Sequence, residues 1–442
     1  MKIYARYSKL KYSIFNAQFS ILNERRNIFM KSVTSLIIKT YNAAADLRAC
    51  SDAQIKKALK ELADAIESNS ASIMRANKKD LIKMDPADPR TDRLLLNEKR
   101  IKSIAASIRQ ISKLPNPSGK TLEKKKLYNG LLLEKVTVPL GVVGAIYESR
   151  PNVTFDISAL CLRSMNACVL KGSSEADNTN RSALKIIKDI LKQNKINPDC
   201  VTLLPPQRET VQELFTATKY VDVLIPRGSE SLIQFVRKNS LVPVIETGAG
   251  VCHVYVEKNA SVDKAINIVV NAKVSRPSVC NALDTVILDR SVAKNILKKL
   301  AVQFLPYQVE VFADAPSYKI LKGYPFLTEA KPADFGREFL SLKCAVKLVD
   351  NIDEALDHIR KYSTKHTEAI VTENKKTGER FLQEVDAAAV YLNASTRFTD
   401  GEEFGLGAEI GISTQKLHAR GPFALEKLVT EKFIIKGNGQ IR

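Results

Sequence analysis

The sequence predicts an α/β protein with two lobes, each built on a parallel sheet, and a small projecting hairpin. Strand-like and helix-like segments alternate twice along the chain, a pattern typical of parallel sheets covered by helices. At 442 residues the chain is too long for one simple core, so two large lobes are expected. An Asn-Gly turn outside these two alternations predicts the hairpin.

Residues 1–29 form an N-terminal extension that we expect to be disordered. They are basic and lack the apolar core of a secretory signal. An organelle-type presequence, a disordered arm and a start site assigned too early are all compatible with this composition. The last is favoured, because Met30 opens a plausible helix.

A helical section follows, with one helix beginning at Ser51. Serine is a good N-cap residue, and apolar residues then recur at helical spacing. They are Ile55, Leu59, Leu62 and Ile66.

Two prolines and a glycine within residues 115–119 end the helical section. The turn at Asn129-Gly130 predicts a hairpin over about residues 122–138. The tail Glu431–Lys436 looks like one more strand, which could pair with this hairpin or with that of another subunit. We therefore expect an oligomerisation arm.

Both lobes are predicted from strands separated by helical segments. In the first lobe the strands are residues 142–147, 168–171, 200–204 and 221–226, with helices from about residue 154 and through residues 184–191. In the second lobe they are residues 242–246, 282–288, 345–348 and 388–392.

Composition limits the classes of function. Lysine and arginine outnumber aspartate and glutamate by 68 to 48, a net charge of +20 that suits nucleic acid, an acidic membrane surface or small anionic ligands. The lysines are spread along predicted helices, without an aromatic RNA-binding motif, which favours small anions. The longest apolar run, Val138–Tyr147, is too short to cross a bilayer.

The cysteines and histidines limit the compartment and the metal chemistry. Seven cysteines without a C-x-x-C pair indicate a reducing compartment, so we expect a cytoplasmic protein. The four histidines show no metal-binding spacing, and no metal is expected.

Cys280 is the cysteine with the most suggestive surroundings. It follows a proline-containing loop, precedes an apolar stretch and lies near Arg276, whose charge would favour the nucleophilic thiolate. From these residues alone, a buried structural cysteine is the favoured interpretation, because most cysteines are of that kind.

Three further loops, residues 147–154, 244–250 and 393–401, are dense in polar groups and follow predicted strands. Loops at the carboxyl ends of parallel strands commonly form binding sites. Taken alone, each loop could simply contain the polar residues that form turns and helix caps. Together the three loops predict a cleft lined by amide and guanidinium donors.

These segments together resemble the glutamyl phosphate reductases of proline biosynthesis, which are relatives of the aldehyde dehydrogenases. The matching residues lie at 139–144, 150–154, 244–248, 276–282 and 393–422, and the resemblance covers nearly everything from about residue 31 onward. It implies an aldehyde dehydrogenase-like fold with two Rossmann-like lobes. The implied domains are a cofactor-binding domain at residues 30–247 and a catalytic domain at residues 248–396. Over residues 397–442 the chain is expected to return to the cofactor-binding domain and to form the C-terminal oligomerisation strand.

The same resemblance assigns the central residues. Cys280 matches the nucleophile, and Asn152 matches the amide that forms the oxyanion hole with the backbone N–H of Cys280. Lys171 matches the lysine that reaches the adenosine ribose of the cofactor, and Glu338 the glutamate that holds the nicotinamide ribose.

Three kinds of role remain around this centre. Gly228 and Ser229 match the helix-opening turn beside the cofactor pyrophosphate. Glu246 matches the glutamate that activates water in hydrolytic relatives, and we expect it to be structural or to steer protonation instead, because a reductase must not hydrolyse its thioester. The candidates for the anionic groups of the substrate are Arg150, Arg276 and Arg397.

The resemblance implies NADPH-dependent reduction of L-glutamyl 5-phosphate to L-glutamate 5-semialdehyde, with release of phosphate. It also implies a homo-oligomer and glutamate 5-kinase as the possible supplier of the substrate. The alternatives are another aldehyde or acyl dehydrogenase of the same superfamily, a catalytically silent relative and a basic nucleic-acid-binding protein.

The sequence departs from the family pattern at four positions. Met165, Ser173 and Ser229 stand where glycine is usual, and Glu402 follows Gly401 where a second glycine is common. The serines leave the cofactor turn plausible, whereas Glu402 puts substrate affinity in doubt.

Overall fold

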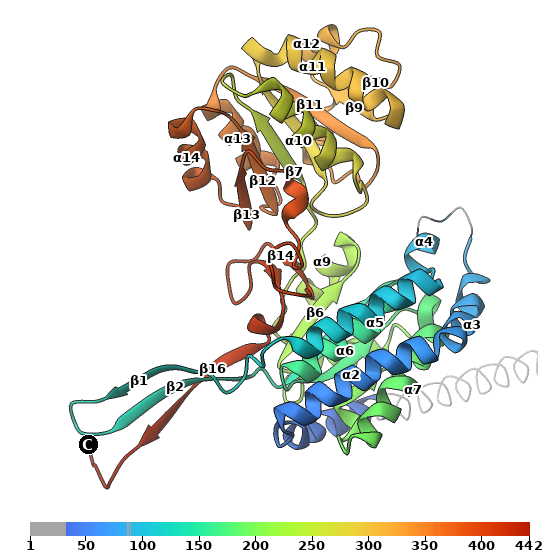
Figure 1. Ribbon diagram of the computed structural model, residues 1–442, viewed down its shortest axis with the longest axis vertical. Helices are drawn as coiled ribbons and strands as arrows, with labels where there is room; N and C mark the ends of the chain where they lie inside the picture. The colour runs from blue at the N-terminus through green and yellow to red at the C-terminus, as the bar shows by residue number, and fades with distance from the viewer. Residues whose placement is uncertain (1–31, 86–87, 89) are drawn as a thin grey trace, which may run out of the picture. The chain divides into compact units, whose positions relative to one another are not determined.

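The computed structural model describes residues 32–85, 88 and 90–442, so the predicted extension at residues 1–29 lies outside the described part. The chain divides into two compact units (Figure 1). The first contains the described residues up to Gly228, Gln234–Val244 and Leu428–Arg442, and the second contains Ser229–Ile233 and Ile245–Lys427. The return to the first unit is therefore shorter than the predicted 397–442, since residues 397–427 belong to the second unit.

The first unit begins with a helical section, as predicted. Ser51 caps α2, because its side chain accepts a hydrogen bond from the backbone N–H of Gln54 at 3.1 Å. The apolar positions at helical spacing, Ile55 through Ile66, are the buried face of that helix. The helices of this section are residues 32–48, α2 (Asp52–Ser68), α3 (Ser70–Leu81), α4 (Arg90–Leu94) and α5 (Glu98–Lys113).

A four-stranded sheet forms the core of this unit, in the order β5-β4-β3-β6, and all its strand pairs are parallel. The α/β prediction is thereby confirmed for the first lobe. The elements are β3 (Val142–Tyr147), α6 (Asn152–Arg163), β4 (Ala167–Lys171), η1 (Ser174–Ala176), α7 (Asp177–Gln193), η2 (Pro198–Cys200), β5 (Val201–Leu203), α8 (Thr210–Thr216), β6 (Val223–Arg227) and the part of α9 (Glu230–Asn239) from Gln234 onward.

The predicted hairpin is present and forms a three-stranded arm with the C-terminal strand (Figure 1). Strands β1 (Thr121–Lys126) and β2 (Leu132–Pro139) flank the turn at Gly130, whose φ of 85° suits glycine. Strand β16 (Val429–Lys436) pairs antiparallel with β2. The C-terminal strand thus joins the hairpin of its own chain, one of the two pairings that the sequence left open.

The second unit contains a seven-stranded parallel sheet in the order β10-β9-β11-β8-β7-β12-β13. Its strands and helices are β7 (Cys252–Val256), α10 (Val262–Val274), β8 (Leu283–Asp289), α11 (Arg290–Phe304), η3 (Leu305–Tyr307), β9 (Glu310–Ala313), α12 (Ala315–Ile320), β10 (Leu327–Glu329), η4 (Pro332–Gly336), β11 (Lys343–Val349), α13 (Ile352–Tyr362), β12 (Thr367–Val371), α14 (Lys375–Glu384) and β13 (Ala389–Leu392). A shorter C-terminal part contains η5 (Thr396–Phe398), β14 (Gly411–Ser413), β15 (Gly421–Phe423) and η6 (Leu425–Lys427).

One predicted strand of this lobe, residues 242–246, is wrong. Only Val244 forms a bridge, and it pairs with Leu224 of the first sheet. The backbone N–H of Glu246 donates instead to the side chain of Gln415, and that of Gly248 donates to the carbonyl of Ile412. This segment is therefore held by the loop around β14, and the second sheet starts at β7.

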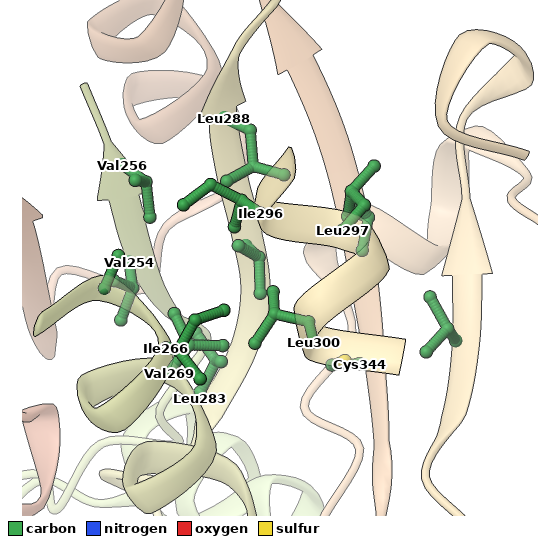
Figure 2. Packing of buried hydrophobic residues seen from close by; sticks show 14 of the residues in the cluster. Val254, Val256, Ile266, Val269, Leu283, Leu288, Ile296, Leu297, Leu300 and Cys344 are labelled. Carbon is green, nitrogen blue, oxygen red and sulfur yellow. The ribbon is translucent and has the colours of Figure 1, made fainter. Parts of the chain in front are cut away.

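Helices α10 and α11 pack their apolar faces on the second sheet (Figure 2). Ile296, Leu297 and Leu300 of α11 are at most 2% exposed and point toward the strands. Leu283 and Leu288, at the two ends of β8, are fully or almost fully buried in the same cluster. This packing fixes the position of β8 and therefore of the loop that enters it.

Candidate active site

Cys280 lies in the loop between α10 and β8, three residues before Leu283 opens the strand. It is partly exposed, whereas Cys161, Cys168, Cys200, Cys252 and Cys344 are buried and Cys50 is partly exposed. The predicted nucleophile is thus the accessible thiol of the second unit.

The main chain behind Cys280 is tightly packed. A Cβ atom added to Gly250 would lie 1.5 Å from the carbonyl oxygen of Cys280, so no side chain fits at that position. The Cys252 thiol donates to the same carbonyl at 3.2 Å. Burial raises the pKa of Cys252 well above its ordinary value, and carboxylates that include Asp284 add to the effect, so Cys252 remains a protonated donor.

Arg276 lies in the loop of Cys280, and Arg397 contacts both ends of that loop. The Arg397 guanidinium donates from Nε to Ser275 Oγ at 3.1 Å and from Nη1 to Asn281 Oδ1. Burial lowers the pKa of Arg397, and the nearby positive charge of Arg276 lowers it further. The Arg397 guanidinium is therefore partly desolvated near the Cys280 loop, whereas Arg276 in that loop is exposed.

Glu338 also belongs to this neighbourhood. Its Oε1 accepts a hydrogen bond from the backbone N–H of Gly250 at 2.9 Å, next to the main chain of Cys280. The following residue, Phe339, donates its N–H to Asp284 Oδ1 at 3.0 Å, and Asp284 lies four residues after Cys280. Both strand β8 and the Gly250 segment thus position the Glu338 loop.

Glu246 is held by Gln415. The Glu246 N–H donates to Gln415 Oε1 at 2.8 Å, and Gln415 Nε2 donates to Glu246 Oε1 at 3.2 Å. These two bonds hold Glu246 in place, and its expected role, structural or steering protonation, stays a prediction. Sequence reasoning missed Gln415, because this partner lies 169 residues from Glu246 along the chain.

In the first unit, Asn152 begins α6 directly after the loop that leaves β3. Its Nδ2 donates to Asp156 Oδ2 at 2.9 Å, one helical turn further on. Burial raises the pKa of Asp156 to about 6, although the bond from Asn152 opposes the rise. Asp156 therefore orients the amide of Asn152, a role that sequence reasoning missed.

Lys171 ends β4 and is 6% exposed. Its Nζ donates to the carbonyls of Gly172 and Pro206 at 2.9 and 3.1 Å, and burial lowers its pKa. Since β3, β4 and β6 are parallel neighbours, the residues after them share one edge of the sheet. The first unit places Arg150, Asn152, Lys171 and Gly228 at that edge.

Two of the departures from the family pattern have local explanations. Met165 adopts φ 64°, in the left-handed region where glycine is favoured, just after α6 ends. Ser229 precedes α9 and accepts a hydrogen bond from the N–H of Leu232 at 3.4 Å, so the serine acts as an N-terminal cap. Glu402 is exposed, and its N–H donates to Asp400.

Across the described residues, no three His, Cys, Asp or Glu side chains gather closely enough to hold a metal ion. No helix in that part of the chain is long and apolar enough to span a membrane.

Comparison with known proteins decides the family. The model of the aldehyde dehydrogenase family matches residues 25–314. The chain is 51% identical over 415 residues to the gamma-glutamyl phosphate reductase of Pelodictyon phaeoclathratiforme, which covers 93% of this chain and 99% of the relative. The chain belongs to the aldehyde dehydrogenase family.

Further comparisons connect the chain with one branch of the aldehyde dehydrogenase family. The gamma-glutamyl phosphate reductase of Legionella pneumophila is 53% identical over 387 residues, covering 87% of this chain and 93% of the relative. The crystal structure of the Thermotoga maritima gamma-glutamyl phosphate reductase superposes with a TM-score of 0.88 at 39% identity, covering 93% of this chain and 99% of that one. The predicted aldehyde dehydrogenase-like fold is confirmed.

We expect iodoacetamide at neutral pH to modify Cys280 before any other cysteine of the native protein. Five cysteines are buried, and burial together with Asp46 raises the pKa of Cys50, which leaves less thiolate there. Each pKa unit corresponds to about a tenfold difference in thiolate. Peptide mass spectrometry after brief labelling measures the order, and labelling in concentrated urea is the control. Faster modification of Cys50 or of a buried cysteine contradicts this geometry.

Proposed function

We propose that the chain reduces L-glutamyl 5-phosphate to L-glutamate 5-semialdehyde and releases phosphate, through a thioester on Cys280, as a step of proline biosynthesis. The observation that carries the proposal is an accessible thiol beside two arginines, in a chain about half identical over almost its whole length to gamma-glutamyl phosphate reductases. An acyl phosphate is the kind of dianionic, activated substrate that such a site suits.

In the first half of the reaction the Cys280 thiolate attacks the acyl carbon. The new C–S bond forms, the C–O bond to the phosphoryl group breaks, and phosphate leaves with the electron pair. The amide of Asn152 and the N–H of Cys280 stabilise the oxyanion of the tetrahedral intermediate. Arg150, Arg276 and Arg397 are the proposed partners of the phosphoryl and carboxylate groups.

The donors at the edge of the first sheet fit a nicotinamide dinucleotide. The Lys171 ammonium lies at a strand end and suits ribose hydroxyls, and the turn at Gly228 and Ser229 opens helix α9 toward a pyrophosphate. In the second unit the Glu338 carboxylate is the proposed partner of the nicotinamide ribose. Members of the aldehyde dehydrogenase family use a nicotinamide cofactor, and we propose NADPH for this chain.

When bound, the reduced nicotinamide supplies the hydride that converts the thioester carbon to the aldehyde oxidation level. The chain's own contribution is to hold the acyl group on Cys280 and to stabilise the oxyanion. Collapse of the resulting thiohemiacetal breaks the C–S bond, returns the electron pair to the Cys280 sulfur and releases the semialdehyde. No step requires water as a nucleophile.

Two partners are part of the proposal. Glutamate 5-kinase would supply the acyl phosphate, and a second copy of the chain would cover the arm. In the described sheet β1 and β16 are edge strands, and their side chains Leu122, Phe433 and Ile435 are about half exposed. Apolar residues on free edge strands favour pairing with another chain. We propose a homo-oligomer of a cytoplasmic enzyme.

Phe433→Lys is expected to lower the oligomeric mass measured by light scattering, because it places a charge in the proposed apolar contact. Val302→Lys adds the same charge on α11, at a side chain that is 67% exposed, and should leave the mass unchanged. An unchanged mass for both variants would argue against pairing through the arm.

Cys280→Ala is expected to lose at least about a thousandfold in turnover, because the acyl group has no nucleophile to receive it. Turnover is measured in reverse, with glutamate semialdehyde, phosphate and NADP+. In the forward direction without NADPH, the wild type should release one phosphate per site from glutamyl 5-phosphate, and the variant none. Cys50→Ala, which changes the other partly exposed cysteine, is the control. Normal turnover of Cys280→Ala would end the thioester scheme, and faster turnover with simple aldehydes would indicate another reaction of the family.

Glu246→Gln should change turnover by less than about tenfold, whereas loss of a general base costs about a hundredfold or more. A glutamine oxygen can still accept from Gln415 Nε2, and the backbone bond to Gln415 Oε1 is unaffected. Steady-state rates and the rate of hydrolysis of the isolated acyl-enzyme are the measurements. A hundredfold fall in turnover would show that Glu246 transfers a proton.

A further inference from the structure

Asn281, the residue after Cys280, uses every polar group of its side chain and its carbonyl to hold one loop. Its Nδ2 donates to the carbonyls of Arg397 and Thr399 at 3.3 and 2.9 Å. Its carbonyl accepts from Thr396 Oγ1 at 2.7 Å, and its Oδ1 accepts from the Arg397 guanidinium. The side chain is almost fully buried, since the residue is 3% exposed.

The Arg397 side chain bridges the two ends of the segment that carries Cys280. Ser275, which accepts from Nε, precedes Cys280 by five residues, and Asn281, which accepts from Nη1, follows it directly. A guanidinium carries five N–H donors. Within the described part of the chain these two bonds are its side-chain contacts, so three donors remain available to a ligand.

The charges around Arg397 favour a doubly charged ligand. Arg276 contributes a second positive charge, and the carboxylate of Asp400 opposes it. One carboxylate does not balance two guanidinium groups, of which that of Arg397 is partly desolvated. A dianion would.

The chemistry of acylation indicates which anion this is. In glutamyl 5-phosphate the phosphoryl oxygen is bonded to the carbon that the sulfur attacks, whereas the α-carboxylate is separated from that carbon by the rest of the side chain. A guanidinium tied to the residues on both sides of the nucleophile lies close to the attacked carbon. The Arg397 guanidinium is therefore in a position to bind the phosphoryl group.

We propose that Arg397 takes the phosphoryl group of the substrate and that Asn281 is the positioning residue that holds Arg397 for this purpose. The inference rests on the proposed function and deepens it, because it separates the phosphate contact from the carboxylate contact. Asn281 acts through Arg397 and the main chain of residues 396–399, without touching the substrate.

The test is the reverse reaction, in which inorganic phosphate is a substrate with its own KM. Asn281→Leu keeps the branching at Cγ and removes the three donor and acceptor contacts of the side-chain amide, while the backbone carbonyl that accepts from Thr396 remains. We expect the KM for phosphate to rise about tenfold to a hundredfold, as for loss of a charge-assisted contact, with the KM for NADP+ within about twofold of the wild type. Arg397→Ala should show the same pattern.

A double-mutant cycle separates positioning from general destabilisation. If Asn281 acts through Arg397, Asn281→Leu in the Arg397→Ala background should change the KM for phosphate by less than about twofold. Asn351→Ala is the matched control: Asn351 caps α13 in the same unit by accepting from two backbone N–H groups. It should lower the unfolding temperature without changing the KM for phosphate.

Each outcome decides the proposal. If the KM for semialdehyde rises and that for phosphate does not, Arg397 binds the carboxylate and the assignment is overturned. If Asn281→Leu behaves as Asn351→Ala does, the residue is merely structural. If Asn281→Leu does not fold, Ser275→Ala is the substitute variant, because it removes the other bond to Arg397. The proposal then requires that Ser275→Ala raise the KM for phosphate severalfold, and an unchanged KM refutes it. A wild type without phosphate-dependent turnover would instead refute the proposed function itself.

Discussion

The candidate site depends on one close approach of two main-chain segments. The backbone at Gly250 lies against the carbonyl of Cys280 so tightly that an added Cβ would come within 1.5 Å of the oxygen. The Cys252 thiol donates to the same oxygen and stays protonated because burial raises its pKa. The backbone of Cys280 is thereby fixed, while its side chain remains partly exposed.

The same contact gives Glu338 and Cys280 a common support. Gly250 donates its N–H to Glu338, while Asp284 on β8 holds the next residue through the N–H of Phe339. Burial raises the pKa of Asp284 to about 7 and lowers that of Lys273, whose Nζ lies 3.9 Å away. The buried Lys273–Asp284 pair helps to hold the loop that contains Glu338 and Phe339, because Lys273 also donates to the carbonyl of Ser341.

Much of the fold follows from local pattern, and the failures have a physical cause. The cap at Ser51 and the turn at Gly130 act within a few residues, so the sequence predicts them correctly. The predicted strand at residues 242–246 fails because its hydrogen bonds go to the loop around β14, far along the chain. Strand β7 was missed although it is fully buried, and its His253 is paired with Glu368, 115 residues away.

The candidate site was predictable only in part for the same reason. Apolar and polar patterning suggested that Cys280 and three loops matter, and the resemblance supplied their roles. Neither showed that Asp156 orients the amide of Asn152 or that Gln415 holds Glu246. Such partners carry no local signal, because each is an ordinary polar residue whose role is set by where the fold places it.

The clamp on Glu246 also bears on how an acyl-enzyme would avoid water. A general base must direct a lone pair at the water that it activates. Gln415 donates to Glu246 Oε1 and accepts from the Glu246 N–H, so both the carboxylate and the backbone of this residue are tied to one partner. Gly248, two residues later, is held by the carbonyl of Ile412, which fixes the segment further. These contacts orient the segment that carries Glu246, and its proposed role as a structural residue and not a water-activating base stays a prediction.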